Sequence, residues 1–397
     1  MLAPLEPKTS LVLHQSSFTA NIKATAANLL NSSFLAALVL FAAMQLPLQC
    51  LGPKLHSLES ANYEFVRRSV PKEGIRASVV CLGDSLLKQG VSPRILENQL
   101  QERVINLSVI GSRPMATYCI LRRLLREGGQ PKLLLVDFEP DILYSDPRSA
   151  VHESAEFYDV EDCLDAALTV GDYNYAGSLL TAVLLPSYRM KYALVDFVTE
   201  LIRNRRSPDF SQVKKYSRNW LVNKGQSLEP AQHGPLPDDS KQADNIVKEW
   251  RKVFQSHSPW VCNQINQTYM SKFIDLANHN SIKVFWLITP MHPRAQKEME
   301  ETGVEAAYVK LARNLQSRFP NLVVIDGRHA NYDGHFFIDS EHFHRHGATV
   351  YSKALGKILQ LKGKDRWIEL PQCDRSDIDK TLEDVEQSSK IPLQKGT

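Results

Sequence analysis

The sequence predicts an α/β fold: a flavodoxin-like three-layer sandwich with a parallel sheet and a mostly helical insertion. Two observations predict it. Short apolar runs alternate with amphipathic stretches of about ten to fifteen residues, which is the pattern of buried parallel strands joined by crossover helices. The chain has 397 residues, 43% of them hydrophobic and 23% charged, which is enough for one substantial core with appendages.

The predicted elements fall into two groups along the chain. The first group consists of strands at 77–82, 104–109 and 132–137, with helices at 93–103 and 115–127 between them. The second group consists of a helix at 271–278, a strand at 283–289, a helix at 304–319, a strand at 321–325 and a helix at 348–361. Residues 145–267 separate the groups and lack sheet periodicity. We expect them to form a helical insertion that shapes a substrate cleft or, alternatively, serves only packing or an oligomer contact.

A serine follows the first predicted strand almost directly. Residues 79–89 read VVCLGDSLLKQ, so Ser85 lies just after an apolar strand and in the first turn of a helix. Open α/β sheets place their chemistry at this edge, which makes Ser85 a candidate nucleophile. The alternative is that Asp84 and Ser85 only cap the helix by accepting hydrogen bonds from its first free N–H groups.

A base for this serine is present near the C-terminus. Asp339 and His342 are three residues apart, and on a tight turn this spacing lets the carboxylate reach Nδ1 of the imidazole while Nε2 faces outward. A serine hydroxyl needs such a base to take its proton. His335, His344 and His346 compete with His342 for this role, and clustered histidines can also mark a metal site or a solvated loop. No second group with zinc-ligand spacing occurs in the sequence, so we expect no metal.

These blocks resemble a known family. Gly83-Asp84-Ser85 and Asp339-x-x-His342 are similar to the first and last signature blocks of the SGNH (GDSL-type) hydrolases, and residues 104–112 (VINLSVIGS) resemble the second block. The similarity covers roughly residues 76–145 and 281–361 and points to the membrane-anchored O-acetyltransferase/esterase-like branch. It implies that Ser85, His342 and Asp339 are catalytic. It also implies that the backbone N–H groups of Ser85 and Gly111 bind the oxyanion.

One block departs from the family pattern. After the third strand the family usually has Gly-x-Asn-Asp, whose asparagine donates a hydrogen bond to the oxyanion, whereas this chain has Asp137-Phe138-Glu139-Pro140-Asp141. A carboxylate cannot donate a hydrogen bond unless it is protonated. The expected oxyanion hole therefore lacks its side-chain donor.

Three further residues near this edge are candidates for substrate binding. His292 and Arg294 follow a predicted core strand, and Arg113 lies two residues after Gly111, so each could contact an anionic or sugar substrate. The prolines on either side of His292 also fit a loop that needs only rigidity. We expect Asn106 to be structural and to fix the end of the second strand.

Composition excludes several classes of partner and cofactor. The net charge is only +3, and the basic run 203–206 (RNRR) is short, so we expect no nucleic-acid partner. The six cysteines include no Cys-x-x-Cys pair and show no regular spacing. We therefore expect buried thiols such as Cys81 and Cys119 rather than disulfides, and no cofactor.

The N-terminal region predicts a membrane attachment. Phe34 to Met44 contains no polar side chain, and apolar character continues unevenly to residue 51, so 34–51 reads as a signal anchor or transmembrane helix after an N-terminal segment at 1–33. A secreted protein with a cleaved signal peptide and a buried helix of a soluble protein are the alternatives. Flanking charges do not settle orientation.

The remaining boundaries follow from this reading. We expect a linker or stalk at 52–75, whose helical part could instead be the first element of the domain, then the SGNH-like domain at 76–365 and a polar tail at 366–397. By the resemblance alone, the domain lies outside the cytoplasmic membrane.

The expected function is serine-dependent ester hydrolysis or O-acyl transfer. The acylated small molecule or polysaccharide that it would use, and a place in the cell envelope, come from the resemblance. One alternative is a catalytically silent binding module in a polysaccharide assembly, favoured by the missing asparagine. A metal-dependent hydrolase that uses the histidine cluster is another.

Overall fold

The structure is a computed structural model that describes most of the chain. The described residues are 35–45 without 38 and 44; 58–229 without 152–154, 156, 191–194, 196–197, 200–201 and 203–210; and 235–374 without 239, 257–258 and 362–364. Residues 1–34 and 46–57 and the tail beyond 374 lie outside them, and with them the predicted N-terminal segment and parts of the predicted anchor and linker.

A six-stranded, entirely parallel sheet forms the centre of the molecule. Its strand order is β2-β1-β3-β4-β5-β6, the order of flavodoxin-like sheets with one strand added at the edge. The strands are β1 (Val79–Gly83), β2 (Val104–Asn106), β3 (Leu133–Asp137), β4 (Lys283–Ile288), β5 (Leu322–Asp326) and β6 (Trp367–Glu369). The predicted α/β class and parallel sheet are confirmed.

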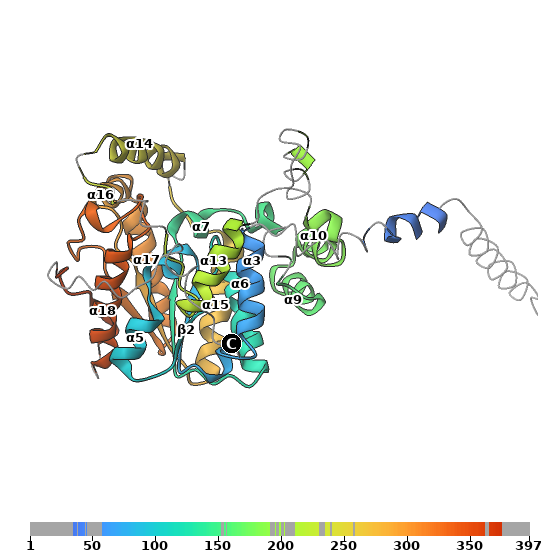
Figure 1. Ribbon diagram of the computed structural model, residues 1–397, viewed down its shortest axis with the longest axis horizontal. Coiled ribbons are helices and arrows are strands. Elements are labelled where there is room, and N and C mark those ends of the chain that lie inside the picture. Colours follow the sequence, from blue (N-terminus) through green and yellow to red (C-terminus); the bar gives the residue numbers. More distant parts are fainter. Residues whose placement is uncertain are drawn as a thin grey trace, which may run out of the picture.

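Helices cover both faces of the sheet, because successive strand residues are buried on opposite sides. In β4, Val284 and Trp286 belong to one core cluster, and Phe285 and Leu287 belong to another. The first cluster packs under α3 (Leu58–Ser69), α6 (Pro114–Arg126), α15 (Gln264–His279) and α17 (Val304–Arg318). The second packs under α4 (Ser85–Gly90), α5 (Pro93–Leu100) and α18 (Arg345–Gln360), and Figure 1 shows α5 and α18 on the opposite side from α3 and α6.

Two elements extend the domain beyond the predicted limits of 76 and 365. Helix α3 contributes buried Tyr63 and Val66 to the first core cluster, so 58–69 is part of the domain rather than a stalk. Strand β6 pairs with β5 through Val324 and Trp367, so the sheet continues into the region predicted as a polar tail. The structure thus decides for the second alternative at α3, the first element of the domain, whereas the three-residue strand β6 is too short for periodicity to reveal it.

The insertion is helical, as predicted, and no strand occurs in its described part. It contains α9 (Val160–Val170), α10 (Tyr173–Leu184), α11 (Pro186–Arg189), α13 (Ser211–Val222) and α14 (Lys241–Ser256). Figure 1 shows α9 and α10 beyond the layer formed by α3 and α6, whereas α14 lies against α16 (Pro293–Thr302). The short helix α7 (Pro140–Tyr144) and the 3-10 turns η2 (Gly74–Arg76), η3 (Pro147–Ala150) and η4 (Gly334–Phe336) complete the described elements.

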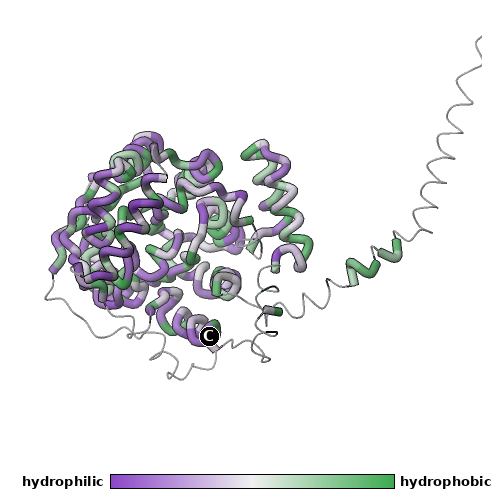
Figure 2. The backbone as a smooth tube through the Cα atoms, turned by 90° about the horizontal axis from the view of Figure 1, so that it is seen from above, coloured by the Kyte–Doolittle hydropathy of each residue, from purple (hydrophilic) through white to green (hydrophobic). Residues whose placement is uncertain are grey.

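Part of the predicted anchor is described. Helical residues in 35–43 include exposed Val39, Leu40 and Phe41, and Figure 2 shows this hydrophobic stretch outside the α/β body. Gln45 Oε1 accepts a hydrogen bond from the backbone N–H of Ser187 at 3.0 Å. Among the described residues, no helix has the length and apolar character needed to span a bilayer.

Candidate active site

Ser85 is positioned by the junction between β1 and α4. Gly83 ends the strand, and a Cβ at this residue would lie 2.3 Å from the carbonyl oxygen of Asp137, so only glycine permits this approach to β3. Asp84 caps the helix: its Oδ1 accepts the N–H of Leu86 at 3.0 Å. Because the Asp84 carboxylate takes the capping role, the hydroxyl of Ser85 is left for another partner.

That partner is His342. The Oγ of Ser85 lies 2.9 Å from Nε2 of His342, and Nδ1 of the same ring lies 2.8 Å from Oδ2 of Asp339. The three side chains form one hydrogen-bonded series across a sequence separation of 257 residues. Their order matches the geometry by which a carboxylate fixes the imidazole tautomer and the imidazole accepts a serine proton.

The turn that carries Asp339 and His342 is held by its own backbone. The other carboxylate oxygen of Asp339, Oδ1, accepts the N–H groups of Glu341 and His342 at 2.9 and 2.7 Å. The rings of Phe337 and Phe343 stack below the turn with centroids 4.9 Å apart. These contacts fix the aspartate and the histidine relative to each other, as the three-residue spacing predicts.

The surroundings shift the pKa values of both His342 and Asp339. Burial works against the charged imidazolium, but the hydrogen bond and the charge of Asp339 outweigh it and raise the pKa of His342. Burial also works against ionised Asp339, yet its bonds to His342 lower the pKa of the carboxyl. At neutral pH, Asp339 is therefore ionised and ready to stabilise a protonated His342.

The competing histidines have other positions. His344 precedes α18 at its N-cap and is buried, which lowers its pKa to about 4, and its ring lies edge-on to that of His346 at 5.1 Å. His335 is exposed beside Asp333. In the described part of the chain, the hydrogen bonds from an imidazole to Ser85 and Asp339 are those of His342, not of these three histidines.

Three other side chains are of types that can ligate a metal ion. Glu300, Glu305 and His329 offer atoms within 4.8 Å of one another. Glu305 already forms an ion pair with Arg328, and Oε1 of Glu300 accepts a hydrogen bond from Gln296. These carboxylates thus have partners of their own, and we assign no metal to them.

The predicted oxyanion loop follows β2. Gly111 is exposed in a turn with φ +69°, a backbone conformation that favours glycine. Asn106 is fully buried, and its Nδ2 donates to the carbonyl oxygens of Leu87 and Val91 while its Oδ1 accepts the N–H of Ser108. Asn106 therefore fixes the strand end against α4, as predicted, and the role of Gly111 toward an oxyanion stays a prediction.

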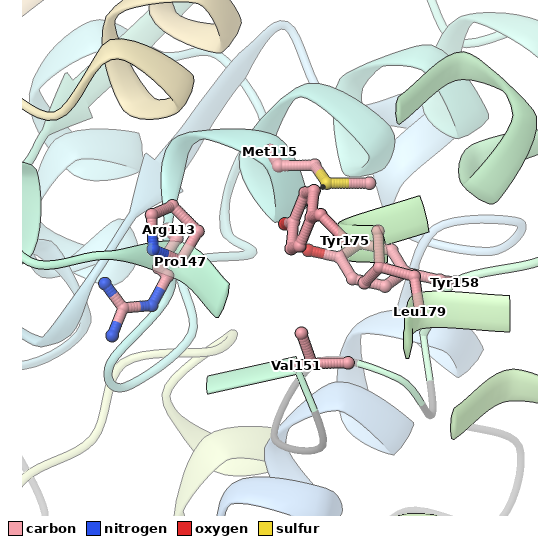
Figure 3. A pocket seen from close by; sticks show the side chains of 7 residues that line it. All are labelled: Arg113, Met115, Pro147, Val151, Tyr158, Tyr175 and Leu179. Atoms are coloured by element: carbon pink, nitrogen blue, oxygen red, sulfur yellow. Dashed lines mark hydrogen bonds between the residues drawn. The ribbon is translucent and has the colours of Figure 1, made fainter. Parts of the chain in front are cut away.

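The three predicted substrate contacts all have partners within the protein. Arg113 donates to Ser145 Oγ at 2.8 Å and lines a cavity of about 10 Å³, roughly the space of one water molecule (Figure 3). His292 is buried, caps α16 and lies 3.4 Å from Asp238. Arg294 pairs with Asp244 of α14. Their contact with a substrate stays a prediction.

Two carboxyl groups beside the triad were not singled out as site residues by sequence. Glu139 follows β3 and is 8% exposed, and its backbone N–H donates to Oδ2 of Asp84 at 2.7 Å. Glu341 precedes His342, and its Oε1 lies 3.8 Å from Nδ1 of that ring. The departure of 137–141 from the family pattern was the available signal for Glu139, whereas nothing in the local pattern marks Glu341.

The fold and the site together define a class: α/β proteins that carry a hydrogen-bonded Ser–His–Asp triad at the carboxyl edge of a parallel sheet. A family model described as "Protein of unknown function (DUF1574)" matches residues 69–348, and the chain belongs to this family. The matched region includes all three triad residues. No curated protein matches the sequence.

Proposed function

We propose that this protein is a serine-dependent esterase or O-acyltransferase of the SGNH type. The observation that carries the proposal is the continuous series from Ser85 Oγ through His342 to Asp339, with both hydrogen bonds below 3.0 Å. A helix cap needs no histidine, and a binding module needs no imidazole held between a carboxylate and a hydroxyl. The triad therefore favours an enzyme over the silent binding module.

The proposed reaction begins when Ser85 Oγ attacks the carbonyl carbon of an ester. His342 Nε2 takes the hydroxyl proton, and Asp339 stabilises the resulting imidazolium through Nδ1–H. The backbone N–H groups of Ser85 and Gly111 would bind the oxyanion. His342 then returns the proton to the departing alcohol, which leaves an acyl group on Ser85.

The second half of the reaction decides between hydrolysis and transfer. His342 removes a proton from water or from a sugar hydroxyl, whose oxygen attacks the acyl-serine and releases a free acid or a new ester. A carbohydrate acceptor and an extracytoplasmic location are supported by the sequence resemblance and by the apolar segment 34–51, and we include both in the proposal.

The test uses the full-length protein with p-nitrophenyl acetate, with and without a carbohydrate acceptor. We expect turnover in the wild type and a loss of about a thousandfold or more in Ser85→Ala and His342→Ala. His335→Ala, in an exposed histidine of the same region, is the matched control and should keep its rate.

Each outcome is decisive. A faster release of p-nitrophenol with acetylated sugar as product would identify a transferase, and acetate alone would identify a hydrolase. A folded wild type without turnover, or equal rates in the wild type and Ser85→Ala, would refute the proposal.

A further inference from the structure

Helix α9 has its apolar face turned outward. Val160, Leu164 and Leu168 follow one another at intervals of four residues, so they lie on one face of the helix, and they are 46%, 60% and 88% exposed. A helix on the surface of a globular domain normally turns such a stripe toward the core and its charges toward water. An outward apolar stripe is typical of a face that contacts something other than water.

The charged side chains of α9 face the domain instead. Asp162 pairs with Arg122 of α6, and its side chain is only 2% exposed. Oδ1 of Asp165 lies 2.6 Å from Nζ of Lys272 in α15, and its Oδ2 accepts the hydroxyl of Tyr269 at 3.0 Å. Turning the apolar stripe inward would break these pairs, one of which is buried, so the outward orientation of the stripe is fixed by the structure.

The neighbouring helix adds to this apolar surface. Tyr173 and Leu184 of α10, which packs along α9, are 80% and 57% exposed. Figure 1 shows α9, α10 and the helical residues 35–43 on the same side of the α/β body. In the described part of the chain, the exposed large hydrophobic side chains lie at 39–41, in α9 and α10, and at 195–202, and the exceptions are Leu221, Val261 and Leu361. We call Val160, Leu164, Leu168, Tyr173 and Leu184 the apolar surface.

One contact joins the predicted anchor to this region. Gln45 lies within 34–51 and is buried, and its Oε1 accepts the N–H of Ser187 at 3.0 Å. Ser187 belongs to α11, which directly follows α10, and it is three residues beyond Leu184 of the apolar surface. The anchor segment therefore touches the domain at the end of α10.

The length of the chain gives a second constraint. Only residues 52–57 separate the end of the predicted anchor from Leu58, where α3 begins, and seven extended steps of the chain reach at most about 25 Å. Helix α3 in turn contacts the segment that leads into α9, because the rings of Tyr63 and Phe157 have centroids 6.0 Å apart. A bilayer that holds 34–51 is therefore within reach of the apolar surface.

We propose that the apolar surface docks on a lipid bilayer, with the side chains of Leu164 and Leu168 among the acyl chains. The proposal rests on the membrane attachment that the proposed function includes. Lipid is favoured over a second copy of the chain because the tether holds the bilayer beside this surface at any protein concentration. Exposed apolar helix faces bind membranes in this way by lying in the plane of the interface. With 34–51, the surface would form a second point of attachment and hold the triad at a fixed height above the membrane.

The test maps lipid contacts in the full-length protein. The protein is placed in phosphatidylcholine vesicles that contain a phosphatidylcholine with a diazirine on its acyl chain, and after illumination the adducts are located by mass spectrometry. We expect adducts in 34–51 and also in 160–173. Leu361, at the end of α18, is 66% exposed and is the matched leucine that should carry none.

A double variant tests the stripe itself. Leu164→Asp/Leu168→Asp should lower the adduct yield at 160–173 by about tenfold or more and leave that of 34–51 unchanged, because carboxylates do not enter the acyl-chain region. Leu361→Asp is the matched control and should change neither yield. Both variants alter exposed side chains far from the triad in sequence, so their thermal midpoints should equal that of the wild type.

The outcomes separate docking from membrane attachment. Adducts confined to 34–51 would overturn the docking surface and leave the attachment in place. A protein without any adduct would lack the attachment, and docking would fail with it. If 160–173 carries no adduct and the double variant dissociates a dimer of the detergent-solubilised protein, a second copy covers the surface and the proposal is overturned. The wild-type map decides even if the double variant fails to fold.

Discussion

Asp339 shows how much of the proposed chemistry depends on a single side chain. Its Oδ1 accepts two backbone N–H groups of its own turn, and its Oδ2 accepts Nδ1–H of His342. It therefore both shapes the turn and holds the tautomer in which Nε2 can take a proton from Ser85.

Asp339→Asn should separate these two roles. The amide oxygen can still accept the backbone bonds, so we expect the protein to fold, while kcat falls by about 10²- to 10⁴-fold because the imidazole loses its orientation and its counter-charge. Asp339 raises the pKa of His342, and activity needs the neutral imidazole, so activity is lost as pH falls through that raised pKa. Without the aspartate charge, the acid limit should shift to lower pH. A pH–rate profile checks this, and an unchanged acid limit would contradict the account.

At the residue scale, the sequence predicted the triad but not the two carboxyl groups beside it. Ser85, Asp339 and His342 occur in short ordered blocks, and such blocks depend only on local spacing. Glu139 and Glu341 belong to two loops that are distant in the sequence, and only tertiary packing brings them beside the triad.

At the scale of elements, the close approach of β1 to β3 fixes the nucleophile. Gly83 leaves no room for a Cβ against the backbone of Asp137, whereas Gly177 in α10 is exposed and an added Cβ would meet nothing within 4 Å. The two glycines therefore form a matched pair for substitution.

Gly83→Ala should destabilise the protein by about 1–3 kcal/mol, because strand β1 must move away from β3. Gly177→Ala should instead be neutral or stabilise it by up to about 1 kcal/mol, since alanine favours the helix. Chemical denaturation measures both values. Equal effects would show that the backbone contact at Gly83 is unimportant.

The helix that begins at the nucleophile carries a buried lysine. Lys88 is fully buried, its Nζ lies 4.8 and 4.9 Å from the ring centroids of Phe65 and Trp220, and it has no hydrogen-bond partner in the described part of the chain. Burial lowers the pKa of this amine well below its ordinary range. The amine thus opposes folding at neutral pH, and the aromatic contacts offset only part of that cost.

Lys88→Met should therefore raise the midpoint of thermal unfolding by a few degrees, about 1 kcal/mol or more for a chain of this size. Lys72→Met, in an exposed lysine, should change stability by less than about 0.5 kcal/mol. A clear loss of stability in Lys88→Met would mean that the buried amine makes a favourable contact beyond those described.

At the scale of the whole molecule, alternating apolar runs and helices were sufficient to predict five of the six parallel strands. The sixth strand was not predicted, because Trp367–Glu369 is short. The helix at α3 was predicted, but whether it is a stalk or the first element of the domain stayed open, because α3 has only a partly apolar face. Both elements join the domain by packing, and strand pairing at a sheet edge is a long-range property.

Helix α3 should be necessary for the fold. A chain that begins at Gly74 lacks Tyr63 and Val66, whose burial contributes about 1.5–3 kcal/mol each, and it also exposes the hydrophobic surface of α13. This loss is comparable to the total stability of most domains. We expect that chain to lack a cooperative thermal transition, whereas a chain that begins at Leu58 should keep one. Cooperative unfolding of the shorter chain would show that α3 is peripheral.

The most direct test of the central claim is to react the folded, full-length protein with a fluorophosphonate and map the adduct by mass spectrometry. The account predicts one adduct, on Ser85, that is absent in Ser85→Ala and forms far more slowly in His342→Ala. A folded wild type that forms no adduct, or an adduct that persists in Ser85→Ala, would contradict it.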